Sequence, residues 1–475
     1  MKNIYQELDA QILGDIYSSS DPMENLSVLC DDFNSRWAGT PDDKHAVKYM
    51  KEKFEQYGLE NSRLEEYELE SWKRAPASLK ITSPIKKTIP CISLPYNMSG
   101  EVEAKLINLG DGILDVYEKR RNEIEDNIVM VTSRNLIRGI PRRIHRRIKF
   151  YHSVLNGAAA FIFQNHYPAY GPATGGVEPV VPAVGVSYEN GEYLARLVRR
   201  KGEVIVRVKT TDTLSKTKSW NVVSDLPGTE KDDEYILVGA HYDGHDIAQG
   251  AIDSGSGAAT VMEMARVLSK IGDKLKKKLT FICFSMEEVG CLGSMAYAER
   301  HEKDLGNLRI MMNFDSAGGP GRKGFNLFGW NQLEHLFERV RKETSAVMPI
   351  YSTSSLSGDC TPFFLRGIPT VAMGDPEGTE MKGGRGFGHT KFDTLDKVEL
   401  KDLWEASANG ARMILRISNE DNWPIKERRS RNELEELLLK SGYIERMNLQ
   451  ERLERLMKER GLTVRSYIRN SKFNI

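Results

Sequence analysis

From about residue 218 the chain alternates short apolar runs with amphipathic stretches, and this alternation constrains the fold more than any other feature. The runs "YILVGA", "LTFICFS", "RIMMNF" and "TVAM" are typical of buried strands. The stretches "SGAATVMEMARVLSKIG" and "LKDLWEASANGARMILRIS" are typical of helices. Because strands alternate with helices, we expect an α/β/α sandwich with a mostly parallel central sheet.

Acidic and imidazole side chains follow these strands at or just beyond their carboxyl ends. They are His241, Asp253, the adjacent pair Glu287 and Glu288, Asp315, and later His389. Open α/β sheets bind ligands in that region, so we expect these side chains to meet. Two imidazoles and three carboxylates can hold two divalent cations, which leaves one glutamate to move protons.

The charge sum agrees with such a centre. Two Zn²⁺ ions bring four positive charges, which Asp253, Glu288, Asp315 and a bridging hydroxide would neutralise. Imidazole with carboxylate suits zinc, although cobalt or manganese also fits this set of ligands.

Single residues in these motifs allow more than one interpretation. Asp243, in "HYDGHD", is expected to orient the ring of His241 as an outer carboxylate. His245 follows a strand and a glycine, which favours a loop histidine over a third imidazole ligand. Asp253, in "GAIDSGSG", is either a helix N-cap or a carboxylate that bridges two metals. Because Glu287 and Glu288 follow a strand end, they can have different roles: one coordinates a metal ion and the other contacts the reacting water.

The remainder of the chain has different patterns. Residues 1–72 are expected to be helical, with Thr40 as an N-cap, Pro41 at the first helical position and Gly58 closing that helix. Residues 75–215 contain short β runs such as "NIVMVTS" and "AAAFIFQN". The basic run from Arg142 to Lys149 is expected to be a solvated helix face and does not by itself indicate a nucleic-acid site.

The composition limits the class of protein. A chain of 475 residues is expected to form two or three domains. Lys plus Arg equals Asp plus Glu, at 67 each, so global charge gives no reason to expect a nucleic-acid partner. The five cysteines form no C-x-x-C pair, which favours a reducing compartment. With no leader profile and no long apolar stretch, we expect a cytoplasmic protein without a membrane span.

These motifs, in this order, resemble the co-catalytic di-zinc aminopeptidase family, which also includes the glutamate carboxypeptidases. The resemblance covers roughly residues 25–72 and 218–416, with "SRWAGTPDDKHAVKYMKEKF" and "GDCTPFFLRGIPTVAMGD" among the similar segments. The segment "HDIAQGAIDSGSG" is most similar to the plasma glutamate carboxypeptidase branch.

The resemblance implies a phosphorylase/hydrolase-like fold and a role for each site residue. It implies one zinc on His241 and Asp315, a second on Glu288 and His389, a bridging Asp253, Glu287 as general base, and Asp243 as the residue that orients His241.

The segment before the catalytic part resembles a protease-associated domain, on "PAVGVSYENGEYL" and "KFYHSVLNGAAAFIFQN". We therefore predict a helical N-terminal part of the peptidase domain (1–74), a β-rich insert (75–215), the zinc peptidase domain (216–420) and a charged helical tail (421–475).

The expected function is that of a zinc exopeptidase that removes N-terminal residues from short peptides, with a metal-bridging hydroxide and Glu287 as the base. The alternative is a carboxypeptidase or dipeptidase, for which Arg385 would supply a cationic pocket near His389. A catalytically silent, receptor-like protein is disfavoured because the set of ligands is complete. The expected partners are short peptides, with no nucleic acid and no membrane, and the insert or the tail is where a homo-oligomer would form.

Overall fold

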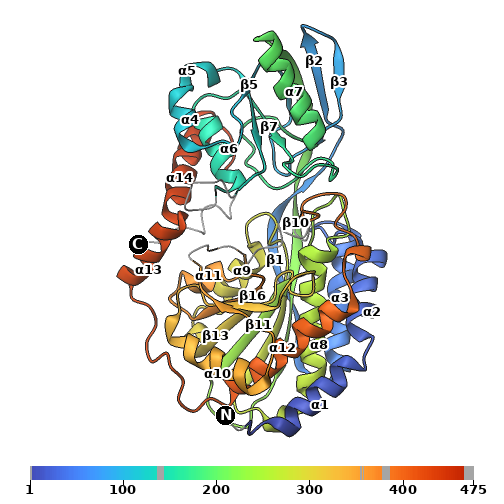
Figure 1. Ribbon diagram of the computed structural model, residues 1–475, viewed down its shortest axis with the longest axis vertical. Helices are drawn as coiled ribbons and strands as arrows, with labels where there is room; N and C mark the ends of the chain where they lie inside the picture. Colours follow the sequence, from blue (N-terminus) through green and yellow to red (C-terminus); the bar gives the residue numbers. More distant parts are fainter. Residues whose placement is uncertain (1–2, 136–143, 354–355, 357, 377–385, 465–475) are drawn as a thin grey trace.

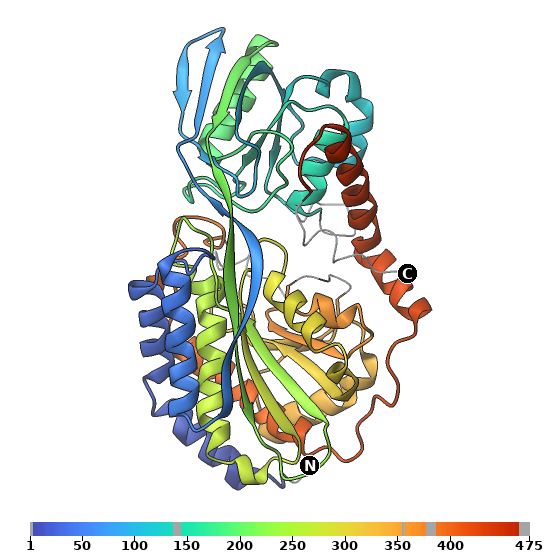
Figure 2. The same cartoon turned by 180° about the vertical axis from the view of Figure 1, so that it is seen from behind.

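The protein consists of a lower lobe, an upper lobe and a C-terminal tail that runs along both (Figures 1 and 2). The computed structural model describes residues 3–135, 144–353, 356, 358–376 and 386–464. The lower lobe contains residues 3–73 and 213–418, the upper lobe lies within residues 78–210, and the tail follows residue 418. Within the described residues, no helix is both long and apolar enough to cross a bilayer.

The lower lobe is built on a mixed sheet of eight strands among the described residues. In spatial order they are β1 (Glu60–Lys73), β10 (Thr213–Leu226), β12 (Lys278–Phe284), β11 (Tyr235–His241), β13 (Leu308–Asn313), β16 (Thr370–Gly374), β14 (Gly324–Asn326) and β15 (Ile350–Tyr351). Strands β12, β11, β13 and β16 are parallel to one another, and β14 pairs parallel with β15. The pairs β1–β10, β10–β12 and β16–β14 are antiparallel. The mixed α/β fold agrees with the sequence, but antiparallel pairs interrupt the parallel arrangement on both sides of the central strands.

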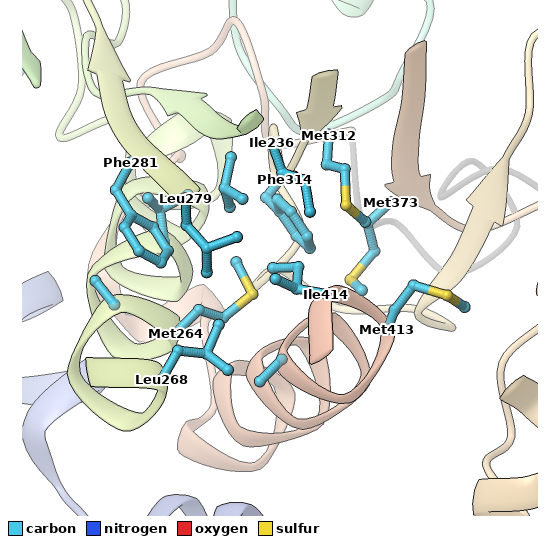
Figure 3. Close-up of a cluster of buried hydrophobic side chains, with 14 of the residues drawn as sticks. Ile236, Met264, Leu268, Leu279, Phe281, Met312, Phe314, Met373, Met413 and Ile414 are labelled. Carbon is cyan, nitrogen blue, oxygen red and sulfur yellow. The ribbon is translucent and has the colours of Figure 1, made fainter. Parts of the chain in front are cut away.

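Helices cover both faces of this sheet. They are α1 (Gln6–Tyr17), α2 (Asp21–Ser27), α3 (Pro41–Gln56), α8 (Ser256–Ser269), α9 (Leu292–Arg300), α10 (Glu334–Thr344), α11 (Thr361–Phe364) and α12 (Leu400–Ser418). Side chains of β11 alternate between the faces: Ile236 and Val238 join the core with α8 and α12, while Leu237 packs on the side of α9 and α11. Figure 3 shows Ile236 in one cluster of buried side chains with Met264 of α8 and Ile414 of α12.

Helix α3 begins where its sequence predicts. The side chain of Thr40 accepts a hydrogen bond from the backbone N–H of Asp43 at 3.3 Å, and Pro41 occupies the first helical position. Gly58 follows the helix with φ of +81°, a left-handed conformation that glycine adopts without strain. This N-terminus is therefore confirmed.

The prediction of helix up to residue 72 is wrong for its last part. Residues Glu60–Lys73 form β1, which pairs antiparallel with β10 from Lys73 opposite Thr213 to Arg63 opposite Val223. The two strands form a long ribbon that rises from the lower lobe to the upper lobe (Figure 2). Glutamate-rich sequence favours a helix, but pairing with a strand about 150 residues later overrides that local preference.

The upper lobe has its own mixed sheet of eight described strands. In spatial order they are β3 (Lys87–Ile89), β2 (Ser78–Ser83), β9 (Ile205–Thr210), β5 (Gly100–Asn108), β6 (Ile128–Thr132), β7 (Ala160–Gln164), β8 (Ala183–Val186) and β4 (Ile92–Ser93). Its helices are α4 (Leu114–Lys119), α5 (Arg121–Ile124), α6 (Arg146–Leu155) and α7 (Tyr188–Lys201). The lobe is thus α/β rather than purely β-rich.

The basic run before Gly157 is not a solvated helix face. Arg142 and Arg143 lie outside the described residues, but Arg146 and Lys149 of α6 are buried, with 8% and 1% exposure. The ammonium group of Lys149 donates to the backbone carbonyls of Thr132 and Arg134. The Nε atom of Arg146 donates to the backbone carbonyl of Gly176, so both long side chains are buried against strands and loops of the upper lobe, which a local charge pattern does not reveal.

The tail forms two helices, α13 (Arg431–Ser441) and α14 (Tyr443–Glu459). Leu434 and Leu438 of α13 join the apolar cluster of the lower lobe, whereas Leu449 and Leu453 of α14 join that of the upper lobe. These leucines therefore pack on the rest of the chain, and the tail connects the two lobes (Figure 1).

We expect Leu453→Ala to loosen this connection. Leu453 is 1% exposed, and truncating a buried leucine typically costs about 2–5 kcal/mol. The measurement is hydrogen exchange of the α14 and α6 amides, which should become faster. Arg455→Ala, at an exposed position of the same helix, is the control. Equal exchange in the two variants would show that the tail does not hold the lobes together.

Candidate metal centre

The predicted ligand residues converge at the carboxyl ends of the central strands. Strands β12, β11 and β13 are adjacent and parallel, so their ends meet at one edge of the sheet, facing the upper lobe (Figure 1). His241 is the last residue of β11, Glu287 and Glu288 follow β12, and Asp315 follows β13. Asp253 lies in the turn η2 (Ala251–Gly255) before α8, and His389 comes from a late loop.

Two groups of donor atoms share Asp253. In one group the Nε2 atom of His241 lies 3.3 Å from Oδ1 of Asp253 and 3.2 Å from Oδ1 of Asp315. In the other, Nε2 of His389 lies 3.4 Å from Oδ2 of Asp253 and 3.1 Å from Oε2 of Glu288. Because Asp253 presents a different oxygen to each group, it occupies the position of a bridging carboxylate rather than that of a simple N-cap.

Several of these atoms are buried without a hydrogen-bond partner in the described part of the chain. They are Nε2 of His241, Nε2 of His389 and Oε1 of Glu288. A buried polar atom left unsatisfied costs about 1–3 kcal/mol, so such a cluster needs a partner that the chain does not provide. Imidazole nitrogen and carboxylate oxygen are suitable ligands for a divalent ion such as zinc. The residues present therefore fit a bound metal.

Asp243 connects the two halves of the centre. Nδ1 of His241 donates to the backbone carbonyl of Asp243 at 3.0 Å and lies 3.4 Å from its Oδ1. The carboxylate also accepts the backbone N–H of Glu287 at 3.1 Å and that of Glu288 at 3.4 Å. Asp243, whose side chain is fully buried, therefore fixes the ring of His241 relative to the turn that contains both glutamates.

The structure also places His245 at the centre, contrary to its interpretation as an ordinary loop histidine. Its Nε2 lies 3.1 Å from Oε2 of Glu288, and its ring centroid is 4.4 Å from that of His389. It is 3% exposed. The glycine-containing segment is a loop as predicted, but the loop folds back over the sheet edge, which residue spacing alone could not show.

Comparison with known proteins agrees with this geometry. Residues 221–414, which contain all the predicted ligands and Glu287, match the model of Peptidase family M28. The chain contains a domain of peptidase family M28. It is therefore a peptidase, an enzyme of the hydrolase class.

Proteins similar to this M28 peptidase include one that is named a carboxypeptidase and one that is named an aminopeptidase. Carboxypeptidase Q of Mus musculus is 23% identical over 412 residues, which cover 84% of this chain and 86% of the relative. A peptidase M28 precursor from Shewanella amazonensis SB2B has the same fold, with a TM-score of 0.77, 22% identity, and coverage of 90% of this chain and 99% of that chain. BSAP, a zinc aminopeptidase from Bacillus subtilis, matches with a TM-score of 0.64, 22% identity, and coverage of 83% and 93%.

The adjacent glutamates of the M28 peptidase have opposite electrostatic environments. Burial raises the pKa of Glu287 well above its usual value, and the carboxylates of Glu288 and Asp315 add to this shift. Burial also acts on Glu288, but His245 and His389 outweigh it and hold the pKa of Glu288 well below its usual value. The surroundings of the two neighbouring carboxyl groups thus differ: those of Glu287 favour its neutral form and those of Glu288 its charged form.

Two further residues support the centre and were missed in the sequence. Arg36 is fully buried and donates hydrogen bonds to the backbone carbonyls of Tyr242, Gln249 and Gly250, so it fixes the loop after β11. Asp393 accepts the backbone N–H groups of Ile252 at 2.7 Å and Asp253 at 3.2 Å. Both act on backbone groups distant in sequence, so no local motif identifies them.

The centre opens into a cavity of about 640 Å³ between the lobes. Glu287, Glu288, Asp315 and His389 line its lower side. The upper lobe contributes residues such as Arg147, and α14 contributes residues such as Arg446. Arg385, the predicted carboxylate-binding residue, lies outside the described residues. Arg147 and Arg446 are cationic side chains that the sequence did not connect with the site.

Proposed function

We propose that this M28 peptidase is a metal-dependent exopeptidase that removes N-terminal residues from short peptides and holds two zinc ions. The observation that supports this most strongly is the pair of donor groups joined by Asp253, with Glu287 beside them in the same cavity. Cobalt and manganese remain alternative metals for this ligand set.

The donor groups suggest how the ions are held. His241, Asp315 and one oxygen of Asp253 would hold one ion, and His389, Glu288 and the other oxygen of Asp253 would hold the second. Bound divalent ions of this kind polarise a carbonyl and lower the pKa of water toward neutrality. Asp243 would keep His241 and the glutamate turn in the required orientation.

Glu287 is the residue that we assign to proton transfer. It lines the cavity and belongs to neither group of donor atoms. As a carboxylate it can take the proton of the attacking water, and as the acid so formed it can return the proton to the leaving amine. A silent, receptor-like role is disfavoured because such a protein would have no use for this acid beside a complete ligand set.

A second function is favoured by the cations in the cavity wall. The Nε atom of Arg147 is buried without a hydrogen-bond partner in the described residues, and both Arg147 and Arg446 line the cavity opposite the acids. A guanidinium group binds a terminal carboxylate well, which is what a carboxypeptidase or dipeptidase requires. Carboxypeptidase Q among the relatives agrees with this alternative.

One assay separates the two functions. We expect dipeptides and tripeptides with a free α-amino group to be hydrolysed, and N-acetylated peptides to be poor substrates, because the acids around the metal centre favour an ammonium group. An aminopeptidase should accept C-terminal amides, whereas a carboxypeptidase or dipeptidase should reject them. Efficient cleavage of N-acetylated peptides would contradict the proposed aminopeptidase activity.

The upper lobe is proposed to act as a protease-associated insert that covers the cavity and limits access. Its support is its position between β1 and β10 and its contribution of Arg147 and neighbouring residues to the cavity wall. Short peptides are the substrates that fit a cavity of about 640 Å³, since sites of roughly 300–1,000 Å³ accommodate ligands of about that size.

A further inference from the structure

His245 has the same surroundings as the two histidines already assigned to the metal centre. Its Nε2 atom lies 3.1 Å from Oε2 of Glu288, as does that of His389. Ligand atoms of His245, Glu288 and His389 all lie within 4.8 Å of one another. The ring is buried, and neither of its nitrogens has a hydrogen-bond partner in the described residues.

A histidine elsewhere in the chain shows what a simple imidazole–carboxylate pair looks like. Nε2 of His301 lies 3.0 Å from each carboxylate oxygen of Glu65 and makes a hydrogen bond to them. At similar distances, Nε2 of His245 makes no hydrogen bond to Glu288, because its direction is wrong for one. Nε2 of His241 and of His389 behave in the same way. All three imidazoles are thus directed at the space among the carboxylates rather than at one oxygen.

The packing around His245 fixes this direction. The ring of Trp37 stacks on it with a centroid distance of 6.0 Å and an interplanar angle of 29°. The backbone around it is held at Tyr242 and at Gly250 by hydrogen bonds from the buried Arg36. A side chain held from both the ring and the backbone is preorganised to bind a ligand.

We propose that His245 is a third imidazole ligand, which binds the same ion as Glu288 and His389. This inference rests on the metal centre proposed above. That ion would have four protein ligands, His245, Glu288, His389 and Asp253, whereas the other would have His241, Asp315 and Asp253. Four protein ligands are typical of closed, tightly bound zinc, and three leave a position open for water or substrate. The two ions therefore differ in affinity and in role.

X-ray absorption spectroscopy of the zinc-loaded wild-type protein tests this without a mutation. Three imidazoles shared by two ions give about 1.5 imidazoles per zinc, and two give about 1. A value near 1 with two ions bound would overturn the role of His245 and leave the metal centre intact. Failure to bind zinc at all would instead overturn the proposed function.

A set of variants then tests whether His245 binds the ion itself or only positions Glu288. His245→Gln leaves an N–H donor near Glu288 but removes the imidazole, and His301→Gln is the matched control. We expect H245Q to weaken the tighter zinc site in calorimetric titration by more than about 100-fold, beyond the 10–100-fold typical of outer partners. H245C, whose thiolate binds zinc, should recover most of the affinity.

A small effect of H245Q on zinc affinity would contradict the role of His245 as a ligand. Zinc affinity of H245Q within about tenfold of the wild type, or a loss no larger than that of H301Q, would overturn the proposal. Circular dichroism of the metal-free variants, matched to the wild type, shows that a loss of affinity is not a loss of fold.

Discussion

Replacing Glu287 with glutamine is expected to lower kcat/KM for a free dipeptide by about 10²–10⁴, the usual contribution of a general acid or base, while the metal content stays unchanged. The amide is nearly isosteric with the carboxyl group but cannot accept the proton of the attacking water. Glu287 is absent from both groups of donor atoms, so its replacement should leave metal binding intact. Kinetics and metal analysis on the same sample measure both quantities.

Glu299→Gln is the matched control for this variant. Glu299 also lines the cavity but is exposed on α9, and its replacement should change kcat/KM little. Near-native turnover of E287Q would show that another group transfers the proton. Loss of metal from E287Q would instead show that Glu287 is a ligand, and the assignments of the adjacent glutamates would then be reversed.

Removal of metal with a chelator is expected to abolish hydrolysis and to lower the melting temperature by several degrees. Asp253 and Glu288 are buried and lie close together, since Nε2 of His389 is 3.4 Å from the first and 3.1 Å from the second. Asp243 is a third buried carboxylate at the same centre. Without cations, these carboxylates repel one another in a medium that screens charge poorly. A ligand present at a thousand times its Kd stabilises the folded state by about 4 kcal/mol.

Addition of zinc to the chelated protein supplies the control. Both activity and melting temperature should return, and the order in which cobalt and manganese restore them identifies the preferred metal. Undiminished peptide hydrolysis in the chelated protein, with metal shown to be absent by elemental analysis, would contradict a metal-dependent mechanism.

The sequence predicted that these side chains meet because their positions follow from a local rule. His241, Glu288 and Asp315 each follow a buried strand, and parallel strands that are neighbours in a sheet bring their carboxyl ends together. Once the strands are identified in the sequence, these three residues are predicted to lie at the same edge of the sheet. The exact roles of these residues stay predictions, which the experiments above test.

A local rule of this kind does not predict features that depend on packing between separate segments of the chain. Residues Glu60–Lys73 have a glutamate-rich sequence that favours a helix, yet they form β1 because β10 offers a partner along its length. The charges of Arg146 and Lys149 suggest a surface, yet both side chains are buried and donate to backbone carbonyls of other segments of the upper lobe. In each case the deciding contact comes from outside the local segment.

His245 shows the same limit within the site. Its position after β11 is local information, but its orientation depends on Arg36 and Trp37, about 200 residues earlier. A loop histidine and a ligand histidine look identical in sequence until that packing is known. Arg385, by contrast, lies outside the described residues, and its proposed role in carboxylate binding stays a prediction.

The most direct test of the account is a crystal structure of the zinc-loaded protein with anomalous data collected at the zinc absorption edge. We expect two anomalous peaks a few ångströms apart, one on each side of Asp253, with His241 and Asp315 at one and Glu288 and His389 at the other. A single peak, or zinc bound away from these side chains, would contradict the proposed two-ion centre.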